Sequence, residues 1–460
     1  MKLPTLKVIN PYDQGVVIEL PWEADASLKD KIGRAYRAWE KWRLVPLEER
    51  IRQVNIGLEK FRVQSDQIAR EITLQMGKPL EQAKREVITF FERAHYMISI
   101  AKESLSPSIL PAKEGFLRRI EHVPLGVVFN IAAWNYPLLI PVNVVVPALL
   151  AGNAVLLKHS ARTPLCGQHF EAAFGGLDIP NLVTNLVLTH EQTMRVIDDQ
   201  RIQYVAFTGS VPGGEQIYRH SAKRLIDVGL ELGGKDPAYV AEDADIDFTV
   251  ENVVDGACYN AGQSCCAVER VYVHHKRYEE FLSKAKKSLE AYQLGDPLES
   301  KTTMGPLVSR SALSLLEQQV IDGVKRGGKL LLGGNRLKGT EGNFFLPTLI
   351  ANLPNNAEIM QEESFGPILP VMSVPGDKEA IFNMADTRFG LTASVWTKDQ
   401  ERAERFAREL EAGTIYQNRC DYLDPALPWT GMRESGIGST LSRYGFLHLT
   451  KRKSIHFRKR

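Results

Sequence analysis

The feature that most constrains the fold is an alternation of short apolar runs with helix-compatible stretches, which begins at Gly126. The runs are rich in β-branched residues, and turn-forming residues bound them. Strands that alternate with helices indicate βαβ units and a parallel sheet that is buried on both faces. The alternation therefore predicts a dinucleotide-binding domain. Its expected strands are residues 126–131, 154–157, 182–188, 204–207 and 225–230.

A second alternation predicts a second α/β domain further along the chain. The first hundred residues show helical periodicity instead, with Pro79 placed where a first helical turn tolerates proline. Residues 115–124 alternate apolar and polar side chains, which is typical of a strand, but they have no core of their own. The second domain's expected strands are residues 270–274, 329–332, 368–374, 393–397 and 413–417.

Size and charge exclude several classes of protein. A chain of 460 residues exceeds what one hydrophobic core usually organises, so at least two domains are expected. The net charge of +2 is no basis for binding nucleic acid or an anionic membrane. Six of the last ten residues are Lys or Arg, which we interpret as a solvated tail flanking a terminal strand.

The cysteines and the apolar segments predict the compartment. The five cysteines are scattered and contain no Cys-x-x-Cys pair, so neither a disulfide framework nor a metal site is expected. No apolar segment is long enough to span a membrane, and the N-terminus lacks the apolar stretch of a secretion signal. These features predict a soluble protein of a reducing compartment, the cytoplasm.

Two motifs contain candidate catalytic residues. Glu231 precedes Leu-Gly-Gly-Lys, and Cys265 follows Gly-Gln-Ser. A thiolate can add to a carbonyl to form an acyl-sulfur intermediate, and a carboxylate can activate the water that hydrolyses it. From residue chemistry alone, Cys265 is either such a nucleophile or an inert thiol. Cys265 is expected just ahead of the second domain's first strand, so the two groups could meet in the cleft between domains.

Three further segments suggest cofactor contacts, and each has a simpler interpretation. Gly209 and Ser210 follow a strand and precede a helix, where backbone amides can bind a pyrophosphate, or they form a plain turn. Lys158 ends a strand and could bind a ribose or phosphate, or it is an ordinary surface lysine. Glu363 and Phe365 precede another strand and either touch a cofactor or belong to an exposed turn.

Asn135 is a candidate for stabilising a developing oxyanion. Its side-chain amide follows another expected strand, so it could donate a hydrogen bond to the reacting oxygen. The alternative is that Asn135 caps a helix beginning near Pro137. No histidine lies within either the glutamate or the cysteine motif, which leaves Glu231 as the candidate base.

Taken together, these motifs resemble the aldehyde dehydrogenase superfamily from about residue 10 to the C-terminus. The resemblance implies that Cys265, rather than its neighbour Cys266, is the nucleophile. It implies that Glu231 is the general base for thioester hydrolysis. The Asn135 amide and the Cys265 backbone N–H would then form the oxyanion hole.

The resemblance also implies a cofactor site. Lys158 would bind the adenosine ribose, Gly209 and Ser210 would approach the pyrophosphate, and Glu363 and Phe365 would hold the nicotinamide ribose and ring. The complete set of implied cofactor-binding residues is Trp134, Lys158, Gly209, Ser210, Leu232, Glu363 and Phe365.

The fold that the resemblance implies has a Rossmann-like cofactor domain, an α/β catalytic domain and a small β oligomerisation element. The expected assembly of subunits is a homodimer or a homotetramer. The implied boundaries are residues 1–114 and 125–232 for the cofactor domain, 233–418 for the catalytic domain, and 115–124 with 449–458 for the oligomerisation strands.

This chain departs from the family pattern at three places. Ala161 replaces a glutamate that grips the ribose hydroxyls in many NAD-preferring members, so either NADP or NAD is expected, with NADP favoured. Val211 replaces the threonine of a common Gly-Ser-Thr turn. Residues 428–431 read Pro-Trp-Thr-Gly where relatives have Pro-Phe-Gly-Gly beside the substrate tunnel.

The predicted function is NAD(P)-dependent oxidation of an aldehyde to a carboxylic acid. The substrate hypothesis is succinate semialdehyde or another small aldehyde, with Arg419 pairing with the substrate carboxylate if its guanidinium faces the tunnel. The alternative is that Arg419 supports the loop from outside. Two other functions stay open: a CoA-acylating dehydrogenase, which would not need Glu231, and a non-catalytic binding protein of the same fold.

Overall fold

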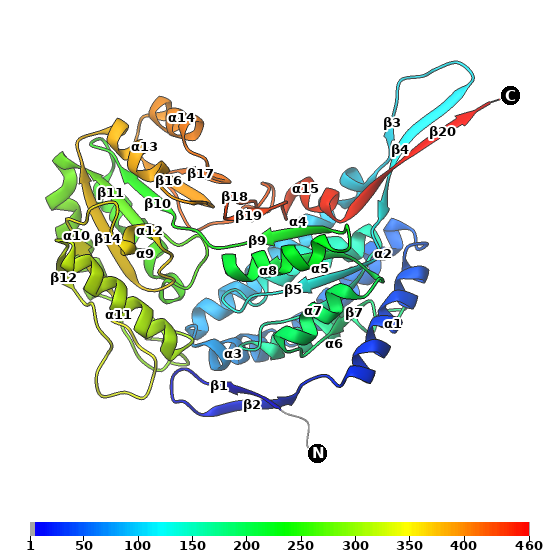
Figure 1. The fold of residues 1–460 in the computed structure, drawn as a ribbon, viewed down its shortest axis with the longest axis horizontal. Coiled ribbons are helices and arrows are strands. Elements are labelled where there is room, and N and C mark those ends of the chain that lie inside the picture. The colour runs from blue at the N-terminus through cyan, green and yellow to red at the C-terminus, as the bar shows by residue number, and fades with distance from the viewer. Residues whose placement is uncertain (1–4, 460) are drawn as a thin grey trace.

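The computed structural model describes residues 5–459, which form two sheets lying side by side and a narrow projecting arm (Figure 1). Short apolar strands form because their β-branched side chains pack on both faces of each sheet. The α/β fold class expected from the alternation is confirmed. Within residues 5–459, no helix is both long enough and apolar enough to cross a membrane.

The first sheet has six strands and contains the first predicted alternation. All neighbours are parallel except the edge strand β19, which is antiparallel to β9. In sheet order, the strands are β19 (Gly436–Ile437), β9 (Asp227–Glu231), β8 (Ile202–Thr208), β5 (Val127–Ile131), β6 (Ala154–Lys158) and β7 (Val183–Asn185).

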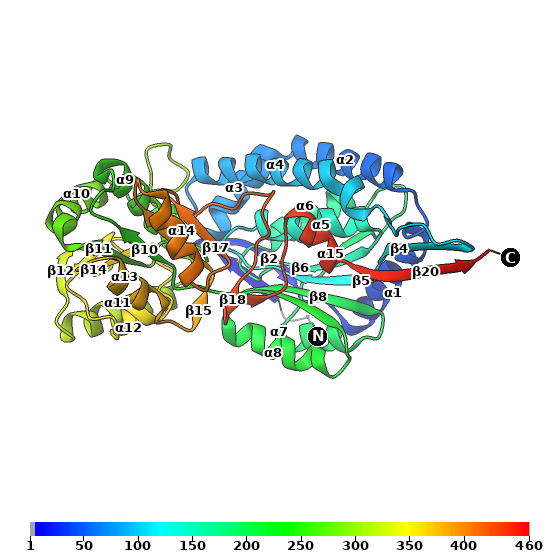
Figure 2. The same cartoon turned by 90° about the horizontal axis from the view of Figure 1, so that it is seen from above.

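Helices cover both faces of this sheet. Helices α7 and α8 lie on the face opposite α3–α6 (Figure 2). The helices of this part are α1 (Asp25–Trp42), α2 (Leu47–Val63), α3 (Ser65–Met76), α4 (Leu80–Leu105), α5 (Leu139–Ala151), α6 (Pro164–Phe174), α7 (His190–Asp198), α8 (Val211–Ala222) and α15 (Ser442–His448).

The second sheet has seven strands, of which only β12 is antiparallel to its neighbour. In sheet order, they are β12 (Lys329–Leu332), β13 (Thr348–Ala351), β14 (Ile368–Val374), β11 (Arg270–His274), β10 (Pro237–Val240), β16 (Thr392–Trp396) and β17 (Thr414–Gln417). The accompanying helices are α9 (Ile246–Cys258), η1 (Tyr259–Gly262), η2 (His275–Arg277), α10 (Tyr278–Glu290), α11 (Arg310–Lys325), α12 (Glu358–Gln361), α13 (Asp377–Ala385) and α14 (Gln400–Glu409).

Two expectations about strands were wrong. Strand β10 lies in the middle of the second sheet and precedes Cys265, so β11 is not that sheet's first strand. This strand has only four residues and begins at a proline, which hides it in the sequence. Residues 5–21 form the hairpin of β1 (Thr5–Ile9) and β2 (Val16–Pro21), rather than part of a helical segment.

The projecting arm consists of three strands at the far end of the six-stranded sheet (Figures 1 and 2). Strand β20 (Thr450–Arg458) pairs along its whole length with β4 (Phe116–Pro124), and β3 (Ser108–Ile109) completes the arm. No residue of β4 is fully buried, as expected for a strand without a core of its own. The domain boundaries inferred from the resemblance stay a prediction.

The chain crosses between the two large sheets at two places. Residues 232–236 connect β9 to β10, and residues 418–431 lead from β17 to the short strand β18 (Met432–Arg433), which pairs with β15 (Phe389–Gly390). Glu231, the last residue of β9, is directly before the first crossing.

Candidate active site

A cavity of about 320 Å³ lies between the two sheets and contains both candidate catalytic side chains. Cys265 reaches it from the loop before β11, and Glu231 reaches it from the end of β9. The two residues are 34 positions apart in sequence, and the tertiary structure brings them to one cavity, as the position of each near a strand end predicted. A cavity of this volume is within the range of small-ligand sites.

The Glu231 carboxylate is held by two threonine hydroxyls from different parts of the chain. Thr208, at the end of β8, donates to one oxygen at 2.9 Å, and Thr440 donates to the other at 2.5 Å. Burial raises the pKa of Glu231 above its usual range, because desolvation disfavours the carboxylate more than the two hydroxyls favour it. A carboxylate with a raised pKa is a better proton acceptor near neutral pH.

The loop that presents Cys265 has an unusual backbone. Asn260, Ala261 and Gly262 have φ values of 53°, 55° and 72°, which lie in the left-handed region. A Cβ at Gly262 would approach the carbonyl oxygen of Gly366 to 2.3 Å, so a glycine is required there. The glycine of the Gly-Gln-Ser-Cys motif is therefore required because no side chain fits at position 262.

Hydrogen bonds hold this strained loop in place. The Asn260 side chain donates to the carbonyls of Asn135 and Gln263, and the Gln263 side chain accepts from the Val308 backbone at 2.9 Å. The Gln of the motif thus ties the loop to a segment 45 residues later in the chain. Such strain persists where the surrounding contacts determine the backbone, as at many functional sites.

The neighbouring cysteines differ in environment. Cys265 is partly exposed, whereas Cys266 is buried and directs its sulfur to the Asp421 carboxylate at 3.1 Å. Its hydrogen bond to Cys265, burial and the nearby Asp421 charge all raise the pKa of Cys266, well above its ordinary value. Because only a thiolate is a competent nucleophile, Cys266 is poorly suited to attack a carbonyl.

The two N–H donors predicted for the oxyanion hole have no partner within the described chain. Neither the Cys265 backbone N–H nor the Asn135 side-chain amide donates a hydrogen bond within residues 5–459. Two hydrogen bonds fix the Asn135 peptide. Its carbonyl accepts from the Lys78 amine at 2.8 Å and from the Asn260 side chain at 3.1 Å. Asn135 does not begin a helix, because α5 starts at Leu139.

The bracing of Asn135 by Lys78 was not predicted from the sequence. Lys78 is buried, forms an ion pair with Glu86, and lies 4.2 Å from the centre of the Tyr136 ring. Glu86 also accepts from the Leu138 backbone at 2.9 Å. The only sequence signal is a lysine directly before Pro79 and a glutamate eight residues later, and many surface helices share that pattern.

Lys158 has the properties of an anion-binding residue. It ends β6, is buried, and its amine has no hydrogen-bond or ion-pair partner in the described part of the chain. Burial alone lowers its pKa to about 8. An unpaired buried amine is costly unless an anion joins it, so Lys158 fits a cofactor phosphate or ribose better than an ordinary surface position.

The turn at Gly209 and Ser210 begins α8 in the expected manner. The Ser210 hydroxyl caps the helix by accepting from the Gly213 N–H at 3.4 Å. A Cβ at Gly209 would lie 2.6 Å from the Phe207 ring, and one at Gly213 would lie 2.9 Å from it. Both positions therefore need glycine so that the Phe207 ring can pack against the turn. The N-terminus of α8 presents backbone amides, which suit a pyrophosphate.

The remaining predicted cofactor residues gather beside the first crossing. The Trp134 and Phe365 rings meet edge to face at 5.6 Å, and Leu232 lines the Cys265 cavity. The Glu363 carboxylate accepts from the Gly234 N–H at 3.3 Å, and burial raises the pKa of Glu363 to about 8. These residues fit a nicotinamide riboside, which needs an apolar wall and a hydrogen-bond acceptor for its hydroxyls.

A buried network supports the Glu363–Phe365 segment from behind. Glu269 accepts from the backbone N–H groups of Ser364 and Phe365, each at 2.8 Å, and from the Lys235 amine at 2.7 Å. The lysine of the glutamate motif thus positions the second cofactor segment. Nothing in the local sequence of Glu269 indicates this contact.

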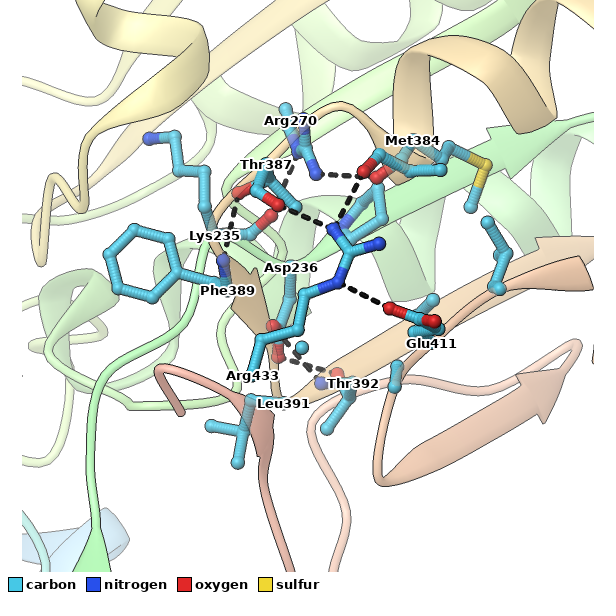
Figure 3. Close-up of a pocket in the computed structure, with 16 residues that line it drawn as sticks. Lys235, Asp236, Arg270, Met384, Thr387, Phe389, Leu391, Thr392, Glu411 and Arg433 are labelled. Carbon is cyan, nitrogen blue, oxygen red and sulfur yellow. Dashed lines mark hydrogen bonds and ion pairs between the residues drawn. The ribbon is translucent and has the colours of Figure 1, made fainter. Parts of the chain in front are cut away.

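A second, much smaller cavity lies beside this network (Figure 3). It measures about 20 Å³ and contains neither Cys265 nor Glu231. Asp236 accepts from Thr392 there, while Arg433 reaches Glu411 and the carbonyl of Ala385. These contacts join the crossing segment to the seven-stranded sheet, so the cavity is part of the framework and not a binding site.

The structure places Arg419 outside the cavity. Its guanidinium stacks 3.4 Å above the centre of the Tyr422 ring, and it lines a separate cavity of about 130 Å³. Arg419 is not among the residues that line the Cys265 cavity, although Tyr422 and Trp429 line both. The hypothesis that Arg419 faces the substrate is therefore wrong for this structure. The guanidinium supports the loop from outside.

Comparisons with known proteins agree with this geometry. The family model described as "Aldehyde dehydrogenase family" matches residues 2–455. A succinate-semialdehyde dehydrogenase [NADP(+)] of Deinococcus radiodurans is 34% identical over 97% of this chain and 94% of its own. The lactaldehyde dehydrogenase of Escherichia coli is 32% identical over 96% of this chain and 92% of its own. A crystal structure of Escherichia coli lactaldehyde dehydrogenase superposes with a TM-score of 0.95 at 30% identity, covering 99% of this chain and 96% of that one.

Proposed function

The chain belongs to the aldehyde dehydrogenase family, and from this premise we propose that it oxidises a small aldehyde to the carboxylic acid through Cys265 and Glu231. Family membership makes it an oxidoreductase. The observation that carries the mechanism is that Cys265 and Glu231 line one cavity. Succinate semialdehyde is the first substrate to test, because a relative of this chain is named for it.

The first chemical step belongs to the Cys265 loop. The Cys265 sulfur adds to the aldehyde carbon, and the resulting oxyanion lies against the Cys265 N–H and the Asn135 amide. The strained backbone and the Lys78 brace keep these donors in place before substrate binds. Preorganised donors lower the barrier because they need no rearrangement when charge develops.

Glu231 acts in the hydrolysis that follows hydride transfer. A bound nicotinamide cofactor would supply the acceptor for the hydride of the aldehyde, and the acyl group would then remain on Cys265 as a thioester. Glu231 then takes a proton from water, which attacks the thioester and releases the acid. The position of Glu231 in the cavity, and its raised pKa, favour hydrolysis over transfer of the acyl group to a CoA thiol.

We infer NADP as the preferred cofactor, with NAD also accepted. The unpaired Lys158 amine supports this inference, together with Ala161, which offers no carboxylate to repel a 2′-phosphate. The Deinococcus radiodurans relative is named for NADP(+). The helix N-terminus at Ser210 accommodates the pyrophosphate, while Phe365, Trp134 and Glu363 hold the nicotinamide riboside.

We propose a homodimer or homotetramer in the cytoplasm. The β3–β4–β20 arm supports an oligomer, since it projects from the cores with an exposed strand edge that a second subunit can cover. All five cysteines are free, which suits a reducing compartment.

The test is a screen of aliphatic, aromatic and ω-carboxylate aldehydes with NADP and with NAD. We expect reduced cofactor and free acid in equal amounts, without added thiol, and turnover with NADP at least as fast as with NAD. Turnover that required CoA would contradict the hydrolytic mechanism. Failure of every aldehyde with both cofactors would contradict the proposed function.

A further inference from the structure

A buried arginine without an anionic partner lies in the same cavity as Cys265 and Glu231. Arg93 is on α4, only 6% exposed, and lines the cavity. It follows Phe90 by three positions and precedes Met97 by four, so it occupies a helix face that is otherwise part of the core. A charged residue at such a position is costly unless an anion accompanies it.

The direct hydrogen-bond contacts of Arg93 with the described residues include no anionic group. One guanidinium nitrogen lies 3.2 Å from the Asn143 side-chain oxygen and 3.5 Å from the Leu139 carbonyl. Its Nε has no hydrogen-bond partner, and no ion pair among residues 5–459 includes Arg93. Both contacts are to neutral oxygens, so the guanidinium keeps its positive charge and free donors at the cavity.

Every buried carboxylate that lines this cavity already has its own partners. Glu86 pairs with Lys78, and Glu231 accepts from Thr208 and Thr440. Asp421 accepts from Ser264 and Cys266. The other two charged residues of the lining, Arg85 and Asp255, are exposed. None of these carboxylates contacts Arg93, although the charges of Glu231 and Glu86 act on its guanidinium from a distance. A substrate carboxylate would therefore be the first anion in direct contact with Arg93.

We propose that Arg93 anchors a carboxylate at the end of the substrate opposite the aldehyde, so that the enzyme selects ω-carboxylate aldehydes. This inference rests on the proposed function. A guanidinium presents parallel N–H donors that match the two oxygens of a carboxylate, and burial strengthens the pairing because water is excluded. Asn143 holds the guanidinium in place, and the sulfur of Cys265 lies in the same cavity to receive the aldehyde end.

The test compares two four-carbon aldehydes that differ only at the far end, succinate semialdehyde and butanal. In Arg93→Met, we expect KM for succinate semialdehyde to rise at least about 30-fold, because the substrate carboxylate loses a buried partner. The change for butanal is expected to be within about threefold, since butanal carries no charge for Arg93 to pair with. Equal losses for both aldehydes would overturn the proposal and make Arg93 a positioning residue for Glu231 or a framework residue.

Arg419→Met is the matched control. It removes the same group from the neighbouring cavity, and we expect both aldehydes to change by less than about threefold. A selective loss for succinate semialdehyde in this variant, with none in Arg93→Met, would overturn the proposal and restore Arg419 as the anchor. Wild-type turnover of butanal serves as the check on the proposed function. Its absence, with every other aldehyde also inactive, would mean that the function itself is wrong.

A binding measurement keeps the proposal testable if Arg93→Met does not fold. Arg93→Lys retains the charge but not the paired donors. Succinate is expected to inhibit wild-type butanal oxidation competitively, and its Ki to rise about tenfold or more in Arg93→Lys. Butyrate, which lacks the second carboxylate, is the control inhibitor. Equal Ki values for succinate in the two proteins would overturn the proposal.

Discussion

The two sheets contribute to the cavity in different ways. The six-stranded sheet offers Glu231, Lys158 and Gly209 at or just beyond the ends of regular parallel strands. The seven-stranded sheet offers Cys265 and Phe365 on loops whose backbones include left-handed residues, among them Phe365 itself at φ 55°. Residues at strand ends need only the sheet to place them, whereas the loop residues depend on contacts from several distant segments.

The difference matters for function because each region performs a separate part of the reaction. In the proposed mechanism, the loop region holds the nucleophile and the oxyanion donors, which must be positioned accurately before substrate binds. In the same proposal, the strand-end region holds the base and would bind the cofactor phosphates, at sites that follow from regular βαβ geometry. Substitutions in the two regions should therefore impair different steps of the reaction, which kinetic measurements can distinguish.

The largest effect is expected in the loop region. Cys265→Ala should lower aldehyde turnover by at least about 10⁴-fold, because no other group can form the acyl intermediate. Cofactor affinity, measured by fluorescence titration, should stay at the wild-type value. Cys266→Ala is the control and should retain substantial activity. Loss of activity in Cys266→Ala alone would contradict the assignment of the nucleophile.

In the strand-end region, Glu231→Gln should separate the two halves of the reaction. A carboxamide cannot accept the proton that hydrolysis requires, so one equivalent of reduced cofactor should form and turnover should then stop. We expect the steady-state rate to fall by about 10²–10⁴-fold while the initial burst remains, measured by stopped-flow absorbance. Steady turnover at the wild-type rate would show that another group activates water.

Gly262→Ala tests whether the loop depends on its strained backbone. The added Cβ would meet the Gly366 carbonyl at 2.3 Å, and the left-handed φ of 72° is itself unfavourable for alanine. We expect activity to fall by about 10- to 100-fold and stability to fall by about 1–3 kcal/mol. Gly176→Ala, where a Cβ would meet nothing within 4 Å, is the control for a general effect of alanine.

The smallest effect is expected at Lys158, and it depends on pH. Burial lowers the pKa of this amine to about 8, and a lysine is cationic below its pKa. Affinity for NADP should therefore be highest below about pH 8 and fall above it by about tenfold, whereas affinity for NAD should change little. The measurement is a cofactor titration at several pH values.

Two variants sharpen the cofactor test. Lys158→Met should remove the pH dependence of NADP binding, and Ala161→Glu should weaken NADP selectively through repulsion of the 2′-phosphate. A wild-type enzyme with a strong preference for NAD, insensitive to both substitutions, would show that another residue binds the ribose.

The regions also differ in how much of each could be predicted from sequence. Strands β5, β6, β8, β9, β11 and β14, and the turn at Gly209, follow from local apolar patterns and glycine positions. The resemblance assigned Cys265 rather than Cys266, and the structure supports that choice by exposure and hydrogen bonding. The braces behind the loops, Lys78 with Glu86 and Lys235 with Glu269, were missed.

The sequence by itself determined the α/β architecture, the strand ends that hold Glu231 and Lys158, and the identity of the thiol and carboxylate motifs. Local propensity and hydrophobic period encode these features, since each depends on residues close together in the chain. The membership of β10 in the second sheet was not encoded in this way, because a four-residue strand beginning with proline has almost no local signal.

Only the tertiary structure decided that Arg93, and not Arg419, lines the cavity that contains Cys265. Arg419 stands beside the substrate loop in sequence but stacks on Tyr422 outside the cavity, whereas Arg93 lies in a helix more than 150 residues before Cys265 and lines it. The role of a buried charge depends on which distant side chains neutralise it. Lys78 forms an ion pair with Glu86, whereas Arg93 forms none among residues 5–459. That pairing is a property of the packed molecule, because the energy of a charge inside a protein depends on groups that only folding brings together.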